Sequence, residues 1–85
     1  MTQIQLCLDH LKPETRETLL EVIYQELRIS PGEISADGNF ELELINHDPE
    51  TTEPENAPYV RINNLLFARV NEARMRELIN GRKRG

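Results

Sequence analysis

Residues 13–28, PETRETLLEVIYQELR, are the segment that decides the fold of this chain. Pro13 suits the first position of a helix, because its missing N–H would have no partner there. A three- and four-residue spacing places four apolar side chains on one helical face: Leu19, Leu20, Ile23 and Leu27. Ser30-Pro31-Gly32 follows, with the pattern of a type II turn. The sequence therefore predicts an amphipathic helix from Pro13 to about Arg28 that ends in a turn.

Residues 3–8 lie before this helix and alternate in polarity. Ile4, Leu6 and Leu8 fall on one side, and polar side chains or Cys7 fall on the other. A period of two is typical of a half-buried strand. A helix is the weaker alternative, since Ile4, Leu8 and Leu11 also stand at helical spacing. We expect a strand.

A hairpin is predicted after the helix, because an Asp-Gly dipeptide separates residues 33–35 from residues 40–45. A two-residue loop would set Ile34 opposite Glu41. A three-residue loop with a bulge would set Ile34 opposite Phe40. We favour the second register, because it pairs two apolar side chains across the hairpin.

Residues 46–58 contain three prolines, four acids and no large apolar residue, which is typical of an exposed, acidic, Pro-rich loop. Residues 59–62 then predict a short strand. Asn63 and Asn64 are suited to cap a helix, which we expect from about Leu65 to Asn80. Residues 82–85 are expected to be a flexible basic tail.

The expected fold is a single α+β domain over residues 1–85. It has a small, mostly antiparallel sheet of three to four strands, covered by two amphipathic helices. The order along the chain is strand, helix, two strands, acidic loop, strand and helix. A length of 85 residues leaves no room for a second domain of ordinary size.

Cysteine usage and the first residues of the chain bear on the compartment. The single Cys7 cannot form an internal disulfide, which fits a reducing compartment. Residues 1–10 lack the basic and apolar regions of a secretory signal, and the chain has no long apolar run that could span a membrane. We expect a cytoplasmic protein.

Charge is distributed unevenly along the chain, whose net charge is −5. Residues 1–57 hold three basic and thirteen acidic side chains, and residues 58–85 hold seven basic and two acidic ones. Three explanations remain open: pairing of charges within one chain, complementarity between chains, and binding of nucleic acid. Arg61 could pair within the chain, facing Glu41 or Glu43 across the sheet.

The predicted helix 65–80 is apolar over more of its circumference than one core requires, and Arg74 falls within that apolar face. Arginine is enriched at binding surfaces. We therefore predict a non-enzymatic, regulatory protein that binds another protein, as a homodimer, through the last strand and helix. The predicted interface is Tyr59, Arg61, Leu66, Phe67, Val70, Asn71, Arg74, Met75 and Leu78.

Nucleic-acid binding is the alternative function. Its contact residues would be the cations of the last helix and tail: Arg69, Arg76, Arg82, Lys83 and Arg84. Against it, the acidic first part of the chain would repel phosphate, and few aromatic residues lie near these cations to stack on bases.

Chemistry-bearing residues are sparse and poorly spaced. Cys7, Asp9 and His10 lie close together and His47-Asp48 is a second pair, but neither has the spacing of a metal site. No serine or cysteine has the neighbouring groups that activate a nucleophile. We expect no catalytic residue, no cofactor and no metal.

Overall fold

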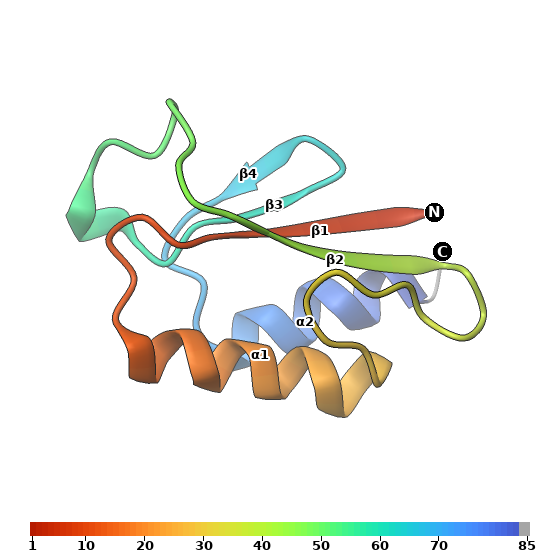
Figure 1. Ribbon diagram of the computed structural model, residues 1–85. Helices are drawn as coiled ribbons and strands as arrows, with labels where there is room; N and C mark the ends of the chain where they lie inside the picture. Colours follow the sequence, from red (N-terminus) through yellow and green to blue (C-terminus); the bar gives the residue numbers. More distant parts are fainter. Residues whose placement is uncertain (84–85) are drawn as a thin grey trace.

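Two helices cover one face of a four-stranded sheet in the computed structural model, which describes residues 1–83 (Figure 1). The expected α+β class with two helices is confirmed. The elements in chain order are β1 (Thr2–Cys7), α1 (Pro13–Leu27), β2 (Phe40–Ile45), the short 3-10 helix η1 (Pro54–Asn56), β3 (Val60–Ile62), β4 (Leu65–Phe67) and α2 (Glu72–Lys83).

The sheet is mixed, with the strand order β2-β1-β3-β4. Strand β1 is parallel to β2, with Ile4 opposite Leu42, and antiparallel to β3, with Ile4 opposite Ile62. Strands β3 and β4 form an antiparallel hairpin. Two of the three strand pairings are antiparallel, so the expectation of a mostly antiparallel sheet is confirmed. The parallel pair of β1 and β2 makes the sheet mixed. It arises because α1 carries the chain back across the sheet between β1 and β2, as parallel pairing requires.

The predictions for the first strand and helix are confirmed. Ile4 and Leu6 on β1 are fully buried, as the alternating pattern requires of a strand with one covered face. Helix α1 buries Leu19, Val22, Ile23 and Leu27, and it ends where Arg28 takes the left-handed conformation, φ 59°. The Arg28 N–H donates a 2.7 Å hydrogen bond to the Tyr24 carbonyl and closes the last turn.

The predicted hairpin before the acidic loop is wrong in strand and register. Residues 33–35 form no strand, and Ile34 makes an isolated antiparallel bridge to Glu41 instead of pairing with Phe40. Phe40 is almost fully buried, whereas Ile34 is 53% exposed. The core takes the larger side chain, and this outweighs the cross-strand apolar contact that favoured the other register.

The predicted start of the second helix is also wrong. Asn63 and Asn64 have φ values of 49° and 73°, and they form the two-residue turn between β3 and β4. Such a turn needs positive φ at both positions, which asparagine tolerates better than most residues. The helix begins only at Glu72, after Asn71, whose Oδ1 accepts the Arg74 N–H at 2.8 Å.

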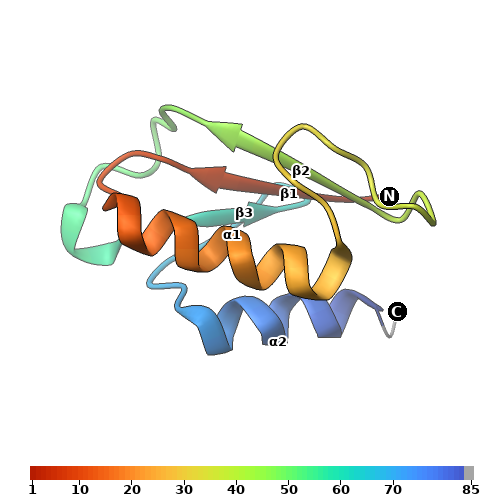
Figure 2. The ribbon, with the colours of Figure 1, turned by 60° about the horizontal axis from the view of Figure 1, so that its bottom comes forward.

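Helices α1 and α2 lie side by side beneath the sheet (Figure 2). Val70, Met75 and Ile79 are fully buried and complete the core with Leu19 and Ile23 of α1. Neither helix in residues 1–83 is long and apolar enough to cross a membrane.

Two expectations about the loop and tail need correction. The loop 46–58 is not exposed throughout, because Asp48 and Thr51 are buried against the sheet. Arg82 and Lys83 belong to α2 and not to a tail, and residues 84–85 lie outside the described part of the chain. Helix α2 continues through Gly81 to Lys83.

Candidate interaction surface

The outer edge of β2 is largely occupied by the chain itself. The Gly32 N–H donates to the Leu42 carbonyl at 2.8 Å, and the Leu42 N–H donates to the Glu33 carbonyl at 3.1 Å. The Ser35 N–H donates to the Phe40 carbonyl at 2.8 Å. Residues 32–35 thus protect this edge, and only the end of β2, at Leu44, has outward-facing backbone groups beyond them.

The outer edge of β4 has no such cover. The N–H groups of Asn63 and Cys7 bond to the carbonyls of Gln3 and Tyr59, so on β3 the backbone groups of Arg61 face β1. Leu66, opposite Arg61, therefore directs its own N–H and C=O away from the sheet. Within residues 1–83, no backbone hydrogen bond reaches these two groups.

Strand β4 has an apolar sequence, Leu65-Leu66-Phe67, without a charge or a proline. Leu65 is 57% exposed, and Leu66 and Phe67 are partly buried. Leu65 and Phe67 pair with the buried Ile62 and Val60 and share their face of the sheet. Strand β4 therefore has none of the charged residues, prolines or bulges that protect many edge strands, and its length of three residues is what limits the edge that it offers.

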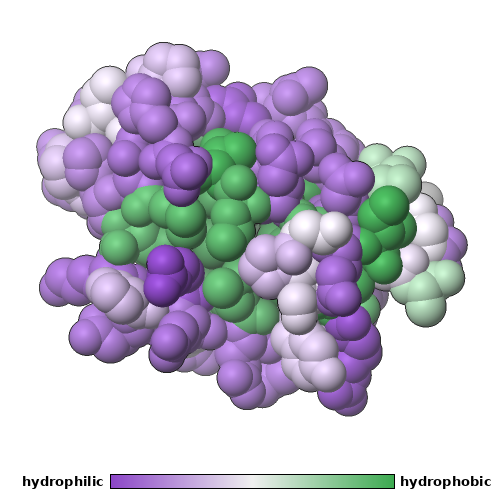
Figure 3. Space-filling model, in the orientation of Figure 1, coloured by the Kyte–Doolittle hydropathy of each residue, from purple (hydrophilic) through white to green (hydrophobic). Residues whose placement is uncertain are grey.

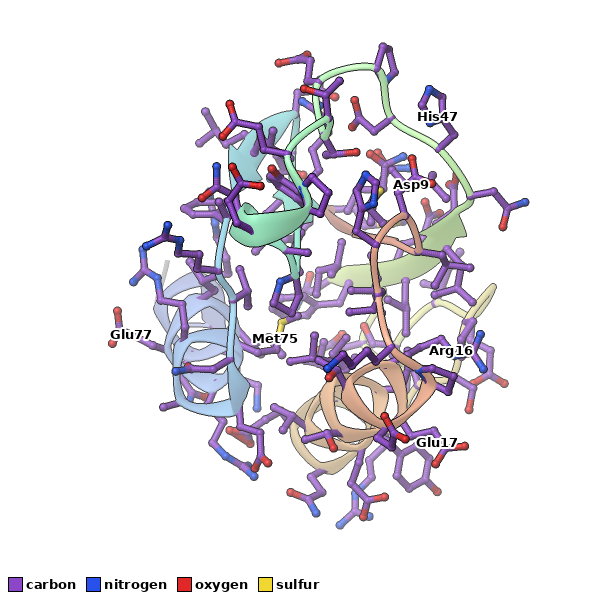
Figure 4. All side chains as sticks on the ribbon, turned by 90° about the vertical axis from the view of Figure 1, so that its left-hand side faces the viewer. Asp9, Arg16, Glu17, His47, Met75 and Glu77 are labelled. Carbon is purple, nitrogen blue, oxygen red and sulfur yellow. The ribbon has the colours of Figure 1, made fainter. Side chains whose placement is uncertain are left out.

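Helix α2 borders this edge with both apolar and charged groups. The Arg74 guanidinium lies 5.7 Å from the centre of the Phe67 ring, and it pairs with Glu77 on the next turn of the helix. Leu78 is partly buried beside them. Figure 4 shows Met75 pointing inward and Glu77 pointing away from the body of the molecule. Arg74 therefore lies at the border of the core, not inside an apolar face.

Most of the other predicted interface residues have structural roles within the fold. Tyr59, Val70 and Met75 belong to the buried set, and the Tyr59 hydroxyl donates to the Glu53 carbonyl at 2.8 Å. Asn71 caps α2. Phe67, Arg74 and Leu78 reach the surface on the side of the helices, whereas the side chain of Leu66 reaches it on the opposite face of β4.

Leu65 is the most exposed residue of this surface, and sequence reasoning missed it. The Asn63-Asn64 pair could have indicated it, because two asparagines suit a tight turn between two short strands and would place Leu65 at the start of the second strand.

Arg61 holds the acidic loop against the open face of the sheet. Its Nη2 and Nε donate to Asp48 Oδ2 at 2.7 and 3.1 Å, and its Nη1 donates to the Asn64 carbonyl at 3.1 Å. The Glu50 N–H, and then Arg61, hold the pKa of the Asp48 carboxyl below its usual value. The expected pairing of Arg61 with Glu41 or Glu43 is replaced by this pairing with the loop.

Among the cations proposed for nucleic acid, several bond to other parts of the chain. Arg76 Nη2 donates to Gln25 Oε1 at 2.9 Å, and Lys83 Nζ donates to the Glu26 carbonyl at 2.8 Å. Arg69 Nε donates to Asn56 Oδ1 at 3.1 Å. Arg82 is exposed, and Arg84 lies outside the described residues.

The residues considered for metal or acid-base chemistry separate into small pairs. Cys7 is buried, with its Sγ 3.4 Å from the Thr51 hydroxyl, and His47 Nδ1 lies 2.6 Å from Asp9 Oδ2 (Figure 4). His10 is exposed. In residues 1–83, no three histidine, cysteine, aspartate or glutamate side chains gather as metal ligands would.

One hollow, of about 400 Å³, lies between the two helices, and its lining includes four acids: Glu14, Glu17, Glu21 and Glu72. Figure 3 shows a further apolar area, between α1 and β2. The edge of β2 beside this area is covered by residues 32–35, whereas no such segment covers the edge of β4.

Comparison with known proteins assigns no relative. No protein-family model matches the chain, and no curated protein is similar to it in sequence.

Proposed function

We propose that this chain is a non-enzymatic, regulatory interaction protein that binds another protein through β4 and the adjoining face of α2. The observation that supports the proposal is the uncovered edge of β4, where the backbone of Leu66 faces outward between the exposed Leu65 and the half-buried Phe67.

An edge of this kind binds by adding a strand. The partner's backbone would bond to the N–H and C=O of Leu66, and its side chains would cover Leu65 and Phe67. Arg74 and Leu78 on α2 extend the contact, since arginine on an aromatic ring is a common anchor of protein interfaces. A two-fold axis lets one such edge serve both partners, so the surface suits a homodimer as well as a complex with another protein.

Two substitutions at opposite edges of the sheet test the proposal. Leu65 and Ile34 are 57% and 53% exposed, so Leu65→Lys and Ile34→Lys make the same change at nearly equal exposure. A lysine on an open edge discourages strand addition. We expect Leu65→Lys to weaken association at least tenfold and Ile34→Lys to leave it unchanged. The assays are light scattering of the purified protein and capture of partners from the native host.

Circular dichroism and thermal melting must show both variants folded. Association that persists in Leu65→Lys, or that fails equally in both variants, would contradict the proposed surface.

We also propose a cytoplasmic location. Cys7 is the only thiol of the chain and lies buried beside Thr51, which fits a protein that needs no disulfide.

A further inference from the structure

We infer that the partner is a second copy of this chain, joined by antiparallel pairing of β4 with β4 about a two-fold axis at Leu66. The inference rests on the proposed function, because it uses the same edge. The result is a continuous eight-stranded sheet across two subunits, with the order β2-β1-β3-β4 in each half.

The hydrogen-bonding pattern of the hairpin sets the register. On β4, Leu66 directs both backbone groups outward, whereas Leu65 and Phe67 direct theirs toward β3. An antiparallel partner must present outward-facing groups of its own. With the two-fold axis at Leu66, the N–H and C=O of Leu66 meet the C=O and N–H of Leu66 in the second copy, and Asn64 falls opposite Ala68.

The side chains are self-complementary in this register. Leu65 of one copy stands opposite Phe67 of the other, on the face that the helices cover, and the two-fold axis repeats the contact. Each Leu65, the most exposed residue of the edge, thus gains one Phe67 as a partner, and the dimer contains two such pairs. The two Leu66 side chains meet on the other face of the sheet.

Electrostatics separates this edge from the other one. Two copies repel each other through their net charge of −5, so the contact must avoid further like charges. Strand β4 carries no charge, and the nearby Arg61 and Arg74 already pair with Asp48 and Glu77. Pairing of β2 with itself would bring Glu41 and Glu43 of two copies together. Self-association therefore belongs to β4.

Cysteine cross-linking tests the register. Directly opposed residues of a hydrogen-bonded antiparallel pair have Cα atoms about 5.5 Å apart, within the range of a disulfide. Leu66→Cys should therefore form a covalent dimer under mild oxidation. Leu65→Cys is the matched control, because two Leu65 residues lie one pair off the axis on each side and are too far apart for a disulfide. The wild type, with buried Cys7, reports any background reaction.

We expect light scattering to give twice the monomer mass of 9.9 kDa at high protein concentration for the wild type, and Leu66→Cys to become a dimer that only reductant separates. A dimer in which Leu65→Cys cross-links as readily as Leu66→Cys would overturn the register and leave the proposed surface standing. A strict monomer that binds another protein, and loses that binding in Leu65→Lys, would overturn the inference and support the proposed function. A monomer whose every association survives Leu65→Lys would overturn both.

Discussion

Asp48 and Arg61 form the most buried ion pair among the described residues, with side chains 9% and 13% exposed. The pair has several hydrogen bonds around it: the Glu50 N–H also bonds to Asp48, and Arg61 reaches the Asn64 carbonyl. Removing one partner of a buried ion pair destabilises the fold, because the other charge stays buried without compensation. This pair therefore fixes the acidic loop to the hairpin that carries β4.

Removing the charge of Asp48 should loosen that attachment. We expect Asp48→Asn to lower the free energy of unfolding by about 1 to 3 kcal/mol, because Arg61 keeps its charge and loses its carboxylate. Glu50→Gln is the control. Glu50 contacts the same guanidinium at 3.4 Å but is 69% exposed, so its replacement should cost less than about 0.5 kcal/mol. Urea unfolding at neutral pH measures both values, and equal losses would show that burial is not the deciding factor.

Acid should have the same effect on the wild type as Asp48→Asn has at neutral pH. The pKa of Asp48 is lowered in the folded state from its usual value of 3.8. Its contribution is therefore complete above pH 3.8 and is lost as the pH falls through the folded-state value. We expect the difference in stability between wild type and Asp48→Asn to be constant from neutral pH down to about pH 4, and to shrink below it. Urea titrations across this range give the difference directly.

At the scale of elements, the turn at Asn63-Asn64 decides what the last third of the chain becomes. Both residues have positive φ, and the Asn63 side chain also accepts the Gln3 N–H at 2.9 Å. The turn thus binds the β3–β4 hairpin to the central strand. With this turn, Leu65–Phe67 forms an edge strand and not the start of a helix. The proposed binding surface depends on that strand.

Substitutions at Asn64 should show this dependence. Its φ of 73° is accessible to glycine but strained for a β-branched residue. We expect Asn64→Gly to keep the stability and the association of the wild type. Asn64→Val should lose about 1 to 2 kcal/mol of stability and weaken association through β4. Thermal melting and light scattering on the same samples measure both effects, and normal association in a folded Asn64→Val would contradict the role of the turn.

The elements that sequence reasoning predicted well have one dominant signal. The spacing of apolar residues in Pro13–Leu27 admits only a helix, and Pro13 marks its first residue. Residues 65–70 have no such signal, because a run of six mostly apolar residues fits a strand and a helix alike. The Asn-Asn pair decided between them through its backbone conformation. Of the candidate surface, the sequence predicts Leu66, Phe67, Arg74 and Leu78 but not Leu65. All three residues of β4 are predicted as helical, so the sequence does not reveal that Leu65 lies on an exposed edge strand.

At the scale of the whole molecule, the charge asymmetry along the sequence is reduced by contacts across the fold. Arg61 pairs with Asp48 and Glu50, and Arg76 and Lys83 of α2 both approach Glu26 of α1. The basic end of the chain therefore meets acids from its first part. These contacts support the first of the three explanations, pairing within one chain.

The response to salt should test both remaining explanations against pairing through an uncharged strand. Two copies that meet at an uncharged strand repel through their net charge of −5, and salt screens that repulsion. We expect the dimer to become modestly tighter from low to physiological ionic strength, as measured by sedimentation. Binding that weakens steeply as salt rises would indicate contacts with phosphates or between opposite charges. That result would contradict pairing through β4.

Strand β1 lies in the middle of the sheet, and its neighbours come much later in the chain. Ile4 pairs with Leu42 on one side and with Ile62 on the other. During synthesis, β1 therefore leaves the ribosome well before either neighbour exists. Its backbone edges are open to chaperones and to other nascent chains until β2 and then β3 emerge, so we expect the sheet to form only after residues beyond Ile62 have left the ribosome.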